Sequence, residues 1–177
     1  MPIKPALFSI ALFFVWGILP SQAQEQKNKK GSLIGTTYNG SKSPNRFKGW
    51  EDIGGLMLTP LNGTDYGVHQ YKKGTSHVFL LEMLISYDET GNNPIWKILD
   101  TLTVSGVNGG RFTEPCICTK NGKDPDELLV GLYNVPASAD YKRGYYSIMR
   151  VWQANRKLAR FVATSKEGVK AFIVGSD

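Results

Sequence analysis

The sequence has few of the residues that most often carry out chemistry in proteins. Its only cysteines are Cys116 and Cys118, and its only histidines are His69 and His77. It contains no C-x-x-C, H-E-x-x-H or G-x-S-x-G motif and no phosphate-binding glycine loop. A structural zinc site needs four ligands, and a lone histidine in a strand is more typical of a structural residue than of a catalyst. We therefore predict neither a metal ion nor a cofactor, and we identify no catalytic residue.

Long apolar runs are also scarce, and the one that exists lies near the N-terminus. Residues 6–19 are almost wholly apolar, Lys4 precedes them and Ser21-Gln22-Ala23 follows. This order is typical of a secretory signal with a small-residue cleavage site, and the run is shorter than the roughly 20 apolar residues that cross a bilayer. We predict a cleavable signal over residues 1–23 and a periplasmic or secreted protein, with a retained membrane anchor as the alternative. No later stretch is apolar enough to span a membrane.

Acidic side chains are outnumbered by basic ones, 15 against 21, so the net charge is +6. Removal of the predicted signal takes away only Lys4, which leaves a charge near +5 on about 154 residues, the size of one domain. The excess lies in residues 27–48 and 142–170. A surface of this sign attracts anionic partners such as an acidic protein or an anionic component of the cell envelope. Nucleic acid is a poor partner for an exported chain without a recognisable reading motif.

The two cysteines stand two residues apart in Pro115-Cys116-Ile117-Cys118. In an extended segment such residues point to the same side, so their sulfur atoms can approach each other. We favour a strained local disulfide, formed in an oxidising compartment. Two reduced, packed thiols are the second interpretation, and a metal or redox site is the third.

Turn-forming residues separate short apolar segments along most of the chain, which is typical of an antiparallel β protein. Residues 24–48 are rich in Lys, Asn, Gly and Ser, so we predict a flexible N-terminal segment there, followed by one β-rich domain over residues 49–177. The fold class is mainly β, as an antiparallel meander, sandwich or open barrel, with an α+β alternative that adds one short helix near Asp124-Pro125. The predicted strands cover residues 56–59, 66–72, 77–86, 96–104, 128–133, 145–154, 158–164 and 169–174.

Acidic residues are scattered, and no spacing selects a catalytic pair. Glu82 stands out because it interrupts the apolar run 78–85. It is either a buried acid with a raised pKa or an outward-facing residue on a half-exposed strand, and we favour the second interpretation. A hydrolase that uses carboxylates would pair Glu82 with Asp100 as acid and base, and this requires both in one cleft.

The most distinctive patch is a predicted hairpin over residues 150–161 that combines arginines with large aromatic rings. Arg and aromatic residues are enriched at interaction hot spots, and they form cation–π pairs. The alternative is that the aromatic rings fill the core. The candidate contact residues are Arg150, Trp152, Arg156, Arg160 and Phe161.

Three stretches of the last hundred residues have a familiar pattern: residues 93–102, the element Asn121-Gly122-Lys123-Asp124-Pro125, and the tryptophan hairpin followed by Gly168-Val169. Together they resemble a group of small uncharacterised exported proteins of proteobacteria. In that group one cysteine precedes the Asn-Gly element and a second follows the Gly-Val pair. Cys118 matches the first, whereas Lys170-Ala171 occupies the region of the second. The resemblance therefore implies a lost long-range disulfide, with Cys116 as the replacement partner of Cys118, and it carries no established activity.

The lack of a catalytic motif beside a basic, aromatic-bearing surface favours a non-enzymatic exported module that binds a macromolecular partner. Two alternatives remain open. One is a small hydrolase that uses carboxylates, and the other is a thiol or metal protein that acts through Cys116 and Cys118.

Overall fold

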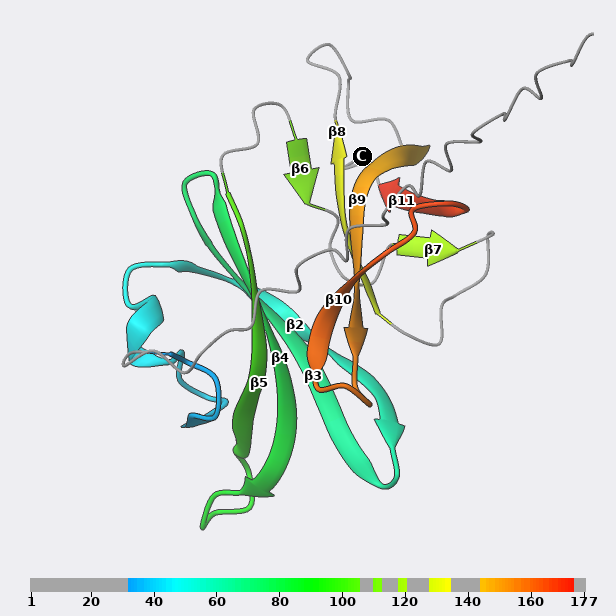
Figure 1. Cartoon of the computed structure of the whole chain (residues 1–177). Helices are drawn as coiled ribbons and strands as arrows, with labels where there is room; N and C mark the ends of the chain where they lie inside the picture. The colour runs from blue at the N-terminus through cyan, green and yellow to red at the C-terminus, as the bar shows by residue number, and fades with distance from the viewer. Residues whose placement is uncertain (1–31, 106–109, 113–117, 121–127, 135–143, 174–177) are drawn as a thin grey trace, which may run out of the picture.

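The computed structural model describes residues 32–105, 110–112, 118–120, 128–134 and 144–173. Over these residues the chain forms two antiparallel β-sheets (Figure 1). Strands account for most of the described chain, which confirms the predicted mainly β, single-domain fold. The helical structure within the described part is one turn of 3-10 helix, η1, over Asn45–Phe47. The short helix predicted near Asp124-Pro125 falls outside these residues.

The first sheet has five strands in the order β1-β5-β4-β3-β2. Asn62 and Gly63 join β2 to β3, and both have positive φ, 53° and 74°, as a two-residue type I′ hairpin turn requires. Strands β2 to β5 therefore follow one another as a meander of long hairpins, and the short β1 adds to the far edge of β5. The bounds are β1 Thr37–Asn39, β2 Glu51–Leu61, β3 Thr64–Lys73, β4 Ser76–Tyr87 and β5 Pro94–Val104.

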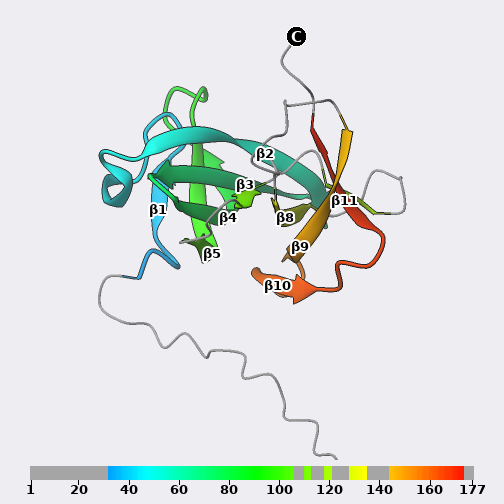
Figure 2. The same ribbon diagram turned by 90° about the horizontal axis from the view of Figure 1, so that it is seen from above.

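The second sheet has the order β6-β8-β9-β11-β7, and β10 pairs with β9 outside this path. Residues 144–147 of β9 pair with β11 and residues 151–155 pair with β10, while β8 pairs along the other edge of β9. The β9–β10 hairpin consequently reaches past β11 toward the first sheet (Figures 1 and 2). The bounds are β6 Gly110–Phe112, β7 Cys118–Lys120, β8 Leu129–Asn134, β9 Gly144–Asn155, β10 Arg160–Thr164 and β11 Val169–Ile173.

Side chains alternate between the two faces of the first sheet, and one face packs against the second sheet. We call this the inner face. It carries Val68, Phe79 and Leu81, which share a buried cluster with Val130 of β8 and Ala154 of β9. Burial of this apolar surface is the main term that holds the two sheets together.

A separate apolar cluster lies on the opposite side of β8 and β9, where the second sheet curls toward β7 and β11. Its members are Cys118, Leu129, Tyr133, Ile148, Val151, Val169 and Ala171. Each of them is at most 5% exposed. The second sheet therefore has a core of its own in addition to the one it shares with the first sheet.

The N-terminal segment corrects one prediction. We predicted a flexible segment over residues 24–48, and of these residues 24–31 lie outside the described chain. Residues 32–48 are instead built onto the first sheet, where β1 pairs with β5 and Phe47 is only 4% exposed. Phe47 joins Tyr71 and Leu80 in a cluster on the face turned away from the second sheet, which we call the outer face. This segment needs few apolar residues of its own to be ordered, because the first sheet supplies the other side of its contacts.

Each of the eight predicted strands is present, although most are longer than predicted. The structure adds β1, β6 and β7, which have three residues each and carry no readable periodicity. No helix among the described residues has the length and apolar character needed to cross a membrane.

Candidate functional site

The outer face of the first sheet contains a small pocket of about 130 Å³ between β2, β3, β4 and β5. We call it the outer-face pocket. Gly55 and Gly67 contribute backbone to it, and its side-chain walls come from Met57, His69, Glu82 and Trp96. Gly67 pairs directly with Glu82 on β4 and with Met57 on β2. The absence of a side chain at Gly67 is what makes the sheet hollow at this point.

Trp96 is held at one side of the pocket by two glycines. A Cβ atom at Gly40 would lie 2.8 Å from Nε1 of Trp96, so only glycine lets the chain after β1 pass this close to the indole edge. A Cβ atom at Gly67 would lie 3.8 Å from the far end of the same ring. The indole is therefore wedged between β1 and β3, which fixes an aromatic wall beside the hollow.

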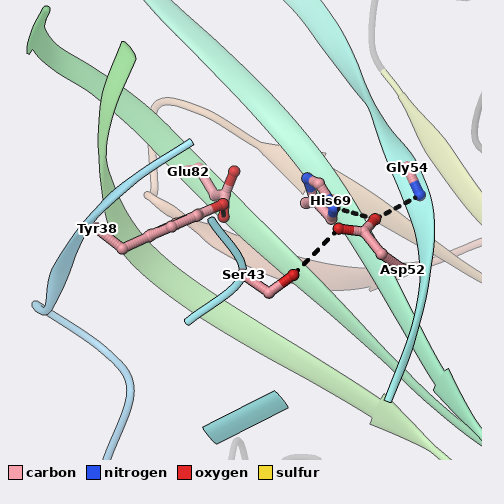
Figure 3. A network of polar contacts seen from close by, with 6 residues as sticks. All are labelled: Tyr38, Ser43, Asp52, Gly54, His69 and Glu82. Carbon is pink, nitrogen blue, oxygen red and sulfur yellow. Dashed lines mark hydrogen bonds and ion pairs between the residues drawn. The ribbon is translucent and has the colours of Figure 1, made fainter. Parts of the chain in front are cut away.

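Glu82 is the most unusual residue of the site because it is only 3% exposed. The Tyr38 hydroxyl donates a hydrogen bond of 2.5 Å to its Oε1 atom (Figure 3). Burial raises the pKa of Glu82 to about 7, the Tyr38 hydrogen bond opposes this rise, and the nearby Asp52 adds to it. The same burial, together with the charge of Glu82, raises the pKa of Tyr38. We had favoured an outward-facing Glu82, and that prediction is wrong: β1 covers the carboxyl group.

A second polar group of the site is formed by His69 and Asp52. His69 Nε2 lies 2.7 Å from Asp52 Oδ1, which also accepts the backbone N–H of Gly54 at 2.9 Å. Ser43 donates its hydroxyl to the other carboxylate oxygen at 3.3 Å (Figure 3). Asp52 is thus anchored by three partners and fixes the orientation of the imidazole.

An aromatic column supports the His69 ring from behind. His69 stacks on Tyr71 with ring centroids 4.7 Å apart, and Tyr71 stacks on Phe47 at 4.2 Å. Phe47 in turn meets the edge of Trp50. Residues 32–50, which precede β2, contain Phe47 and Trp50 and also Tyr38, the hydrogen-bond donor to Glu82. This segment therefore positions both His69 and Glu82.

The other histidine has no place in this site. His77 lies at the beginning of β4, away from the pocket, and its Nδ1 atom is 2.9 Å from the side-chain amide nitrogen of Gln70. Burial, followed by the charge of Lys72, lowers the pKa of His77 to about 4, so its ring is neutral at neutral pH. This environment is that of a structural histidine.

The predicted contact residues of the β9–β10 hairpin do not share one surface. Arg150, Trp152 and Phe161 lie on the side of Ala154, whereas Arg160 pairs with Asn155 on the opposite side. Phe161 packs against the inner-face core, and its backbone N–H donates to Asp100 at 2.7 Å. Of the five residues, Arg150 and Arg160 are exposed, and Trp152, Arg156 and Phe161 are partly buried.

Arg156 also acts within the fold, because its guanidinium donates a hydrogen bond to the carbonyl oxygen of Thr59 on β2. That carbonyl belongs to an edge strand, and Pro60 follows it. A capped carbonyl beside a proline weakens this end of β2 as a template for a further strand. The β9–β10 hairpin thus contacts the first sheet at two points, through Arg156 on β2 and through Phe161 in the inner-face core. We call this pair of contacts the clamp.

The clamp predicts different consequences for two neighbouring residues of the hairpin. Phe161→Ala should lower the free energy of unfolding by about 2 kcal/mol, because a partly buried ring leaves the core. Arg160→Ala, at an exposed position, should change it by less than about 0.5 kcal/mol. Urea unfolding followed by fluorescence measures both, and equal effects of the two substitutions would contradict the clamp.

The proposed acid–base pair of Glu82 and Asp100 is ruled out by the strand register. Asp100 pairs with Leu81, which lies in the inner-face core, whereas Glu82 pairs with Ile98 of the outer-face cluster. Directly opposed residues share a face, so the two carboxyl groups lie on opposite faces of the sheet. A bulge between these pairs places Asp100 beside Phe161 instead of in the pocket.

The cysteine predictions are only partly within the described chain. Cys118 is buried at the start of β7 and is 2% exposed, while Cys116 falls outside the described residues, as does any pairing between the two. Within the described ranges, no group of three or more His, Cys, Asp and Glu side chains is arranged to hold a metal ion.

The described residues define an antiparallel, mainly β protein with a glycine-floored pocket that contains a buried carboxyl group. Comparison with protein-family models, curated proteins and solved structures gives no match to this chain. The site is therefore interpreted from its own chemistry.

Proposed function

We propose that this protein is an exported, non-enzymatic module that uses the outer-face pocket to hold a small chemical group presented by a larger partner. The observation that carries the proposal is the pocket, in which an aromatic wall, a buried carboxyl group and an oriented imidazole surround a floor of two glycines. The secretory-type N-terminus supports a location in the periplasm or outside the cell.

The volume of the pocket suits a single chemical group better than a whole small-molecule ligand. Its volume of about 130 Å³ is well below the roughly 300–1,000 Å³ of pockets that enclose a complete small molecule. It suits one side chain or one end group, and the rest of the partner would lie over Met57, an exposed β2 residue on the same face. This arrangement favours a macromolecular partner.

Acid–base catalysis is the second candidate function, and one observation favours it. A carboxyl group with a pKa of about 7 is suited to give and take a proton at neutral pH. With Asp100 on the other face, its partner in catalysis would have to be His69. This candidate predicts turnover of a bound compound, whereas the binding module predicts retention of the compound unchanged.

Gly67→Ala tests the role of the pocket without disturbing the fold. The added Cβ atom would meet the Leu56 carbonyl oxygen at 3.5 Å and the Trp96 ring at 3.8 Å, both ordinary contacts. The methyl group therefore fills part of the hollow without a clash. We expect the variant to be as stable as the parent or more stable by roughly 0.5–1 kcal/mol, because glycine weakens a strand, and to bind the partner about tenfold more weakly or worse.

The measurement is capture from the native cell envelope on the immobilised chain without residues 1–23, with Gly67→Ala and Arg160→Ala as matched variants. Loss of a captured partner with Gly67→Ala alone supports the pocket. Loss with Arg160→Ala alone would refute the pocket and return the contact to the predicted basic hairpin. Thermal unfolding of each variant confirms that it is folded.

A further inference from the structure

The polar atoms that the pocket offers to a ligand are hydrogen-bond acceptors. His69 Nε2 donates its hydrogen to the Asp52 carboxylate. In the neutral imidazole the other nitrogen, Nδ1, is then a hydrogen-bond acceptor. A Cβ atom at Gly55 would lie 3.0 Å from Nδ1, which places this atom toward the glycine floor. The ionised Glu82 carboxyl group also only accepts. A group held here must therefore donate hydrogen bonds.

The charge and the shape of the pocket narrow the choice of bound group further. Among the described residues, no lysine or arginine lines the pocket, and its one acidic side chain is Glu82. Trp96 stands as a wall beside this carboxyl group. A carboxylate next to an indole is the combination that stabilises a desolvated cation, through an ion pair and a cation–π contact.

We infer that the group held in the outer-face pocket is a primary ammonium group on a short alkyl stem, with Glu82 as its counter-ion, His69 Nδ1 as a second acceptor and Trp96 against the stem. A lysine side chain or an amino end group of a partner has this chemistry. The inference rests on the proposed function and specifies what the pocket accepts. It also limits the expectation of an anionic partner, because the basic excess of the chain does not extend to the residues of this pocket.

The ion pair makes binding depend on pH. The titratable groups that face Glu82 are Tyr38 from β1, Asp52 from β2, and His69 and Tyr71 from β3. Burial keeps the pKa of Glu82 at about 7 in the empty pocket. An ammonium group lowers that pKa, so binding below about pH 7 releases a proton. Below this pKa the affinity should fall about tenfold per pH unit, because only the ionised carboxyl group pairs with the cation.

The test is an NMR titration of the ¹⁵N-labelled chain without residues 1–23, using n-butylammonium as the probe and n-butanol and butyrate as matched neutral and anionic compounds. We expect butylammonium alone to shift the amide signals of Gly55 and Gly67 and the indole N–H of Trp96 at pH 8. The affinity behind these shifts should fall about tenfold at pH 6, and the shifts should vanish in Glu82→Gln. Gly67→Ala, as a folded variant with a smaller pocket, should bind more weakly at both pH values.

The outcomes separate this inference from the proposed function. Pocket shifts with butanol or butyrate but not with butylammonium, or shifts with butylammonium that persist unchanged in Glu82→Gln, overturn the ammonium inference and leave a working pocket. Failure of all three compounds to shift the pocket also overturns it. In that case the proposed function is decided by the envelope capture, where an unchanged partner in Gly67→Ala would refute it.

Discussion

Glu82→Gln should stabilise the folded protein by about 3 kcal/mol at pH 8 and by almost nothing at pH 4. The native pKa of Glu82 is about 7, against an ordinary value of 4.5, and each pKa unit corresponds to about 1.4 kcal/mol. Between these two values the native state holds a proton that the unfolded state has released. The free energy of unfolding of the parent protein therefore falls as the pH rises through this window and levels off above about pH 7. Glutamine does not titrate, so the variant escapes this loss.

The substitution leaves the local geometry in place, because the Tyr38 hydroxyl that donates to Glu82 can donate to an amide oxygen as well. Urea unfolding at pH 4, 6 and 8 gives the difference between variant and parent. Glu89→Gln, the same chemical change at an exposed position, is the matched control and should show a far smaller pH dependence. A difference for Glu82→Gln that does not grow between pH 4 and 8 would mean that the carboxyl group is not desolvated.

Burial of Glu82 could not be predicted from its own neighbourhood in the sequence. The nearly continuous apolar run around it is consistent with a buried strand, and the predicted strand was confirmed. What covers the carboxyl group is Tyr38, which lies 44 positions earlier in the chain, in a segment whose polar composition predicts no ordered structure. Its three-residue strand β1 is stabilised by pairing with β5, so its order is a tertiary effect that local composition does not encode.

The glycines that line the outer-face pocket, in contrast, stand out in the sequence. Gly67 lies inside a predicted strand, and Gly54-Gly55 stands just before another. Glycine in the interior of a strand weakens it, and often marks a bulge or a close approach of another group. At Gly54 there is a bulge and a φ of 105°, and at Gly67 the Trp96 ring approaches. These glycines are a better indicator of the site than the arginines and aromatic rings of the β9–β10 hairpin.

The hairpin shows why composition alone misplaces a contact surface. Its strands, β9 and β10, were predicted from the sequence and confirmed. The packing of the two sheets decides which face of this hairpin meets the first sheet. Phe161 lies on that face and packs against the inner-face core, which contains Leu81. Large aromatic residues supply both interfaces and cores, so the same composition fits both roles.

Ala171→Cys should stabilise the protein by about 4 kcal/mol under oxidising conditions, in a background where Cys116→Ser removes the competing thiol. In the β7–β11 pair, Ala171 is the direct register partner of Cys118, and both are buried, at 0% and 2% exposure. Directly opposed residues of antiparallel strands have Cβ atoms about 4.5–5.5 Å apart, close to the separation that a disulfide bridges after a small adjustment. Closing a loop of roughly 50 residues restricts the unfolded chain by about this amount of free energy.

The strand register alone leads to this prediction. Urea unfolding of the oxidised variant, compared with the same variant after dithiothreitol, isolates the contribution of the bond, and mass spectrometry confirms that it links residues 118 and 171. Ala171→Ser in the same background controls for the added polar atom. If the thiols stay reduced in air, or if oxidation leaves the midpoint unchanged, β7 does not hold Cys118 opposite Ala171. The core of the second sheet would then need a different register, with β11 still paired to β9 through Ala171 and Tyr146.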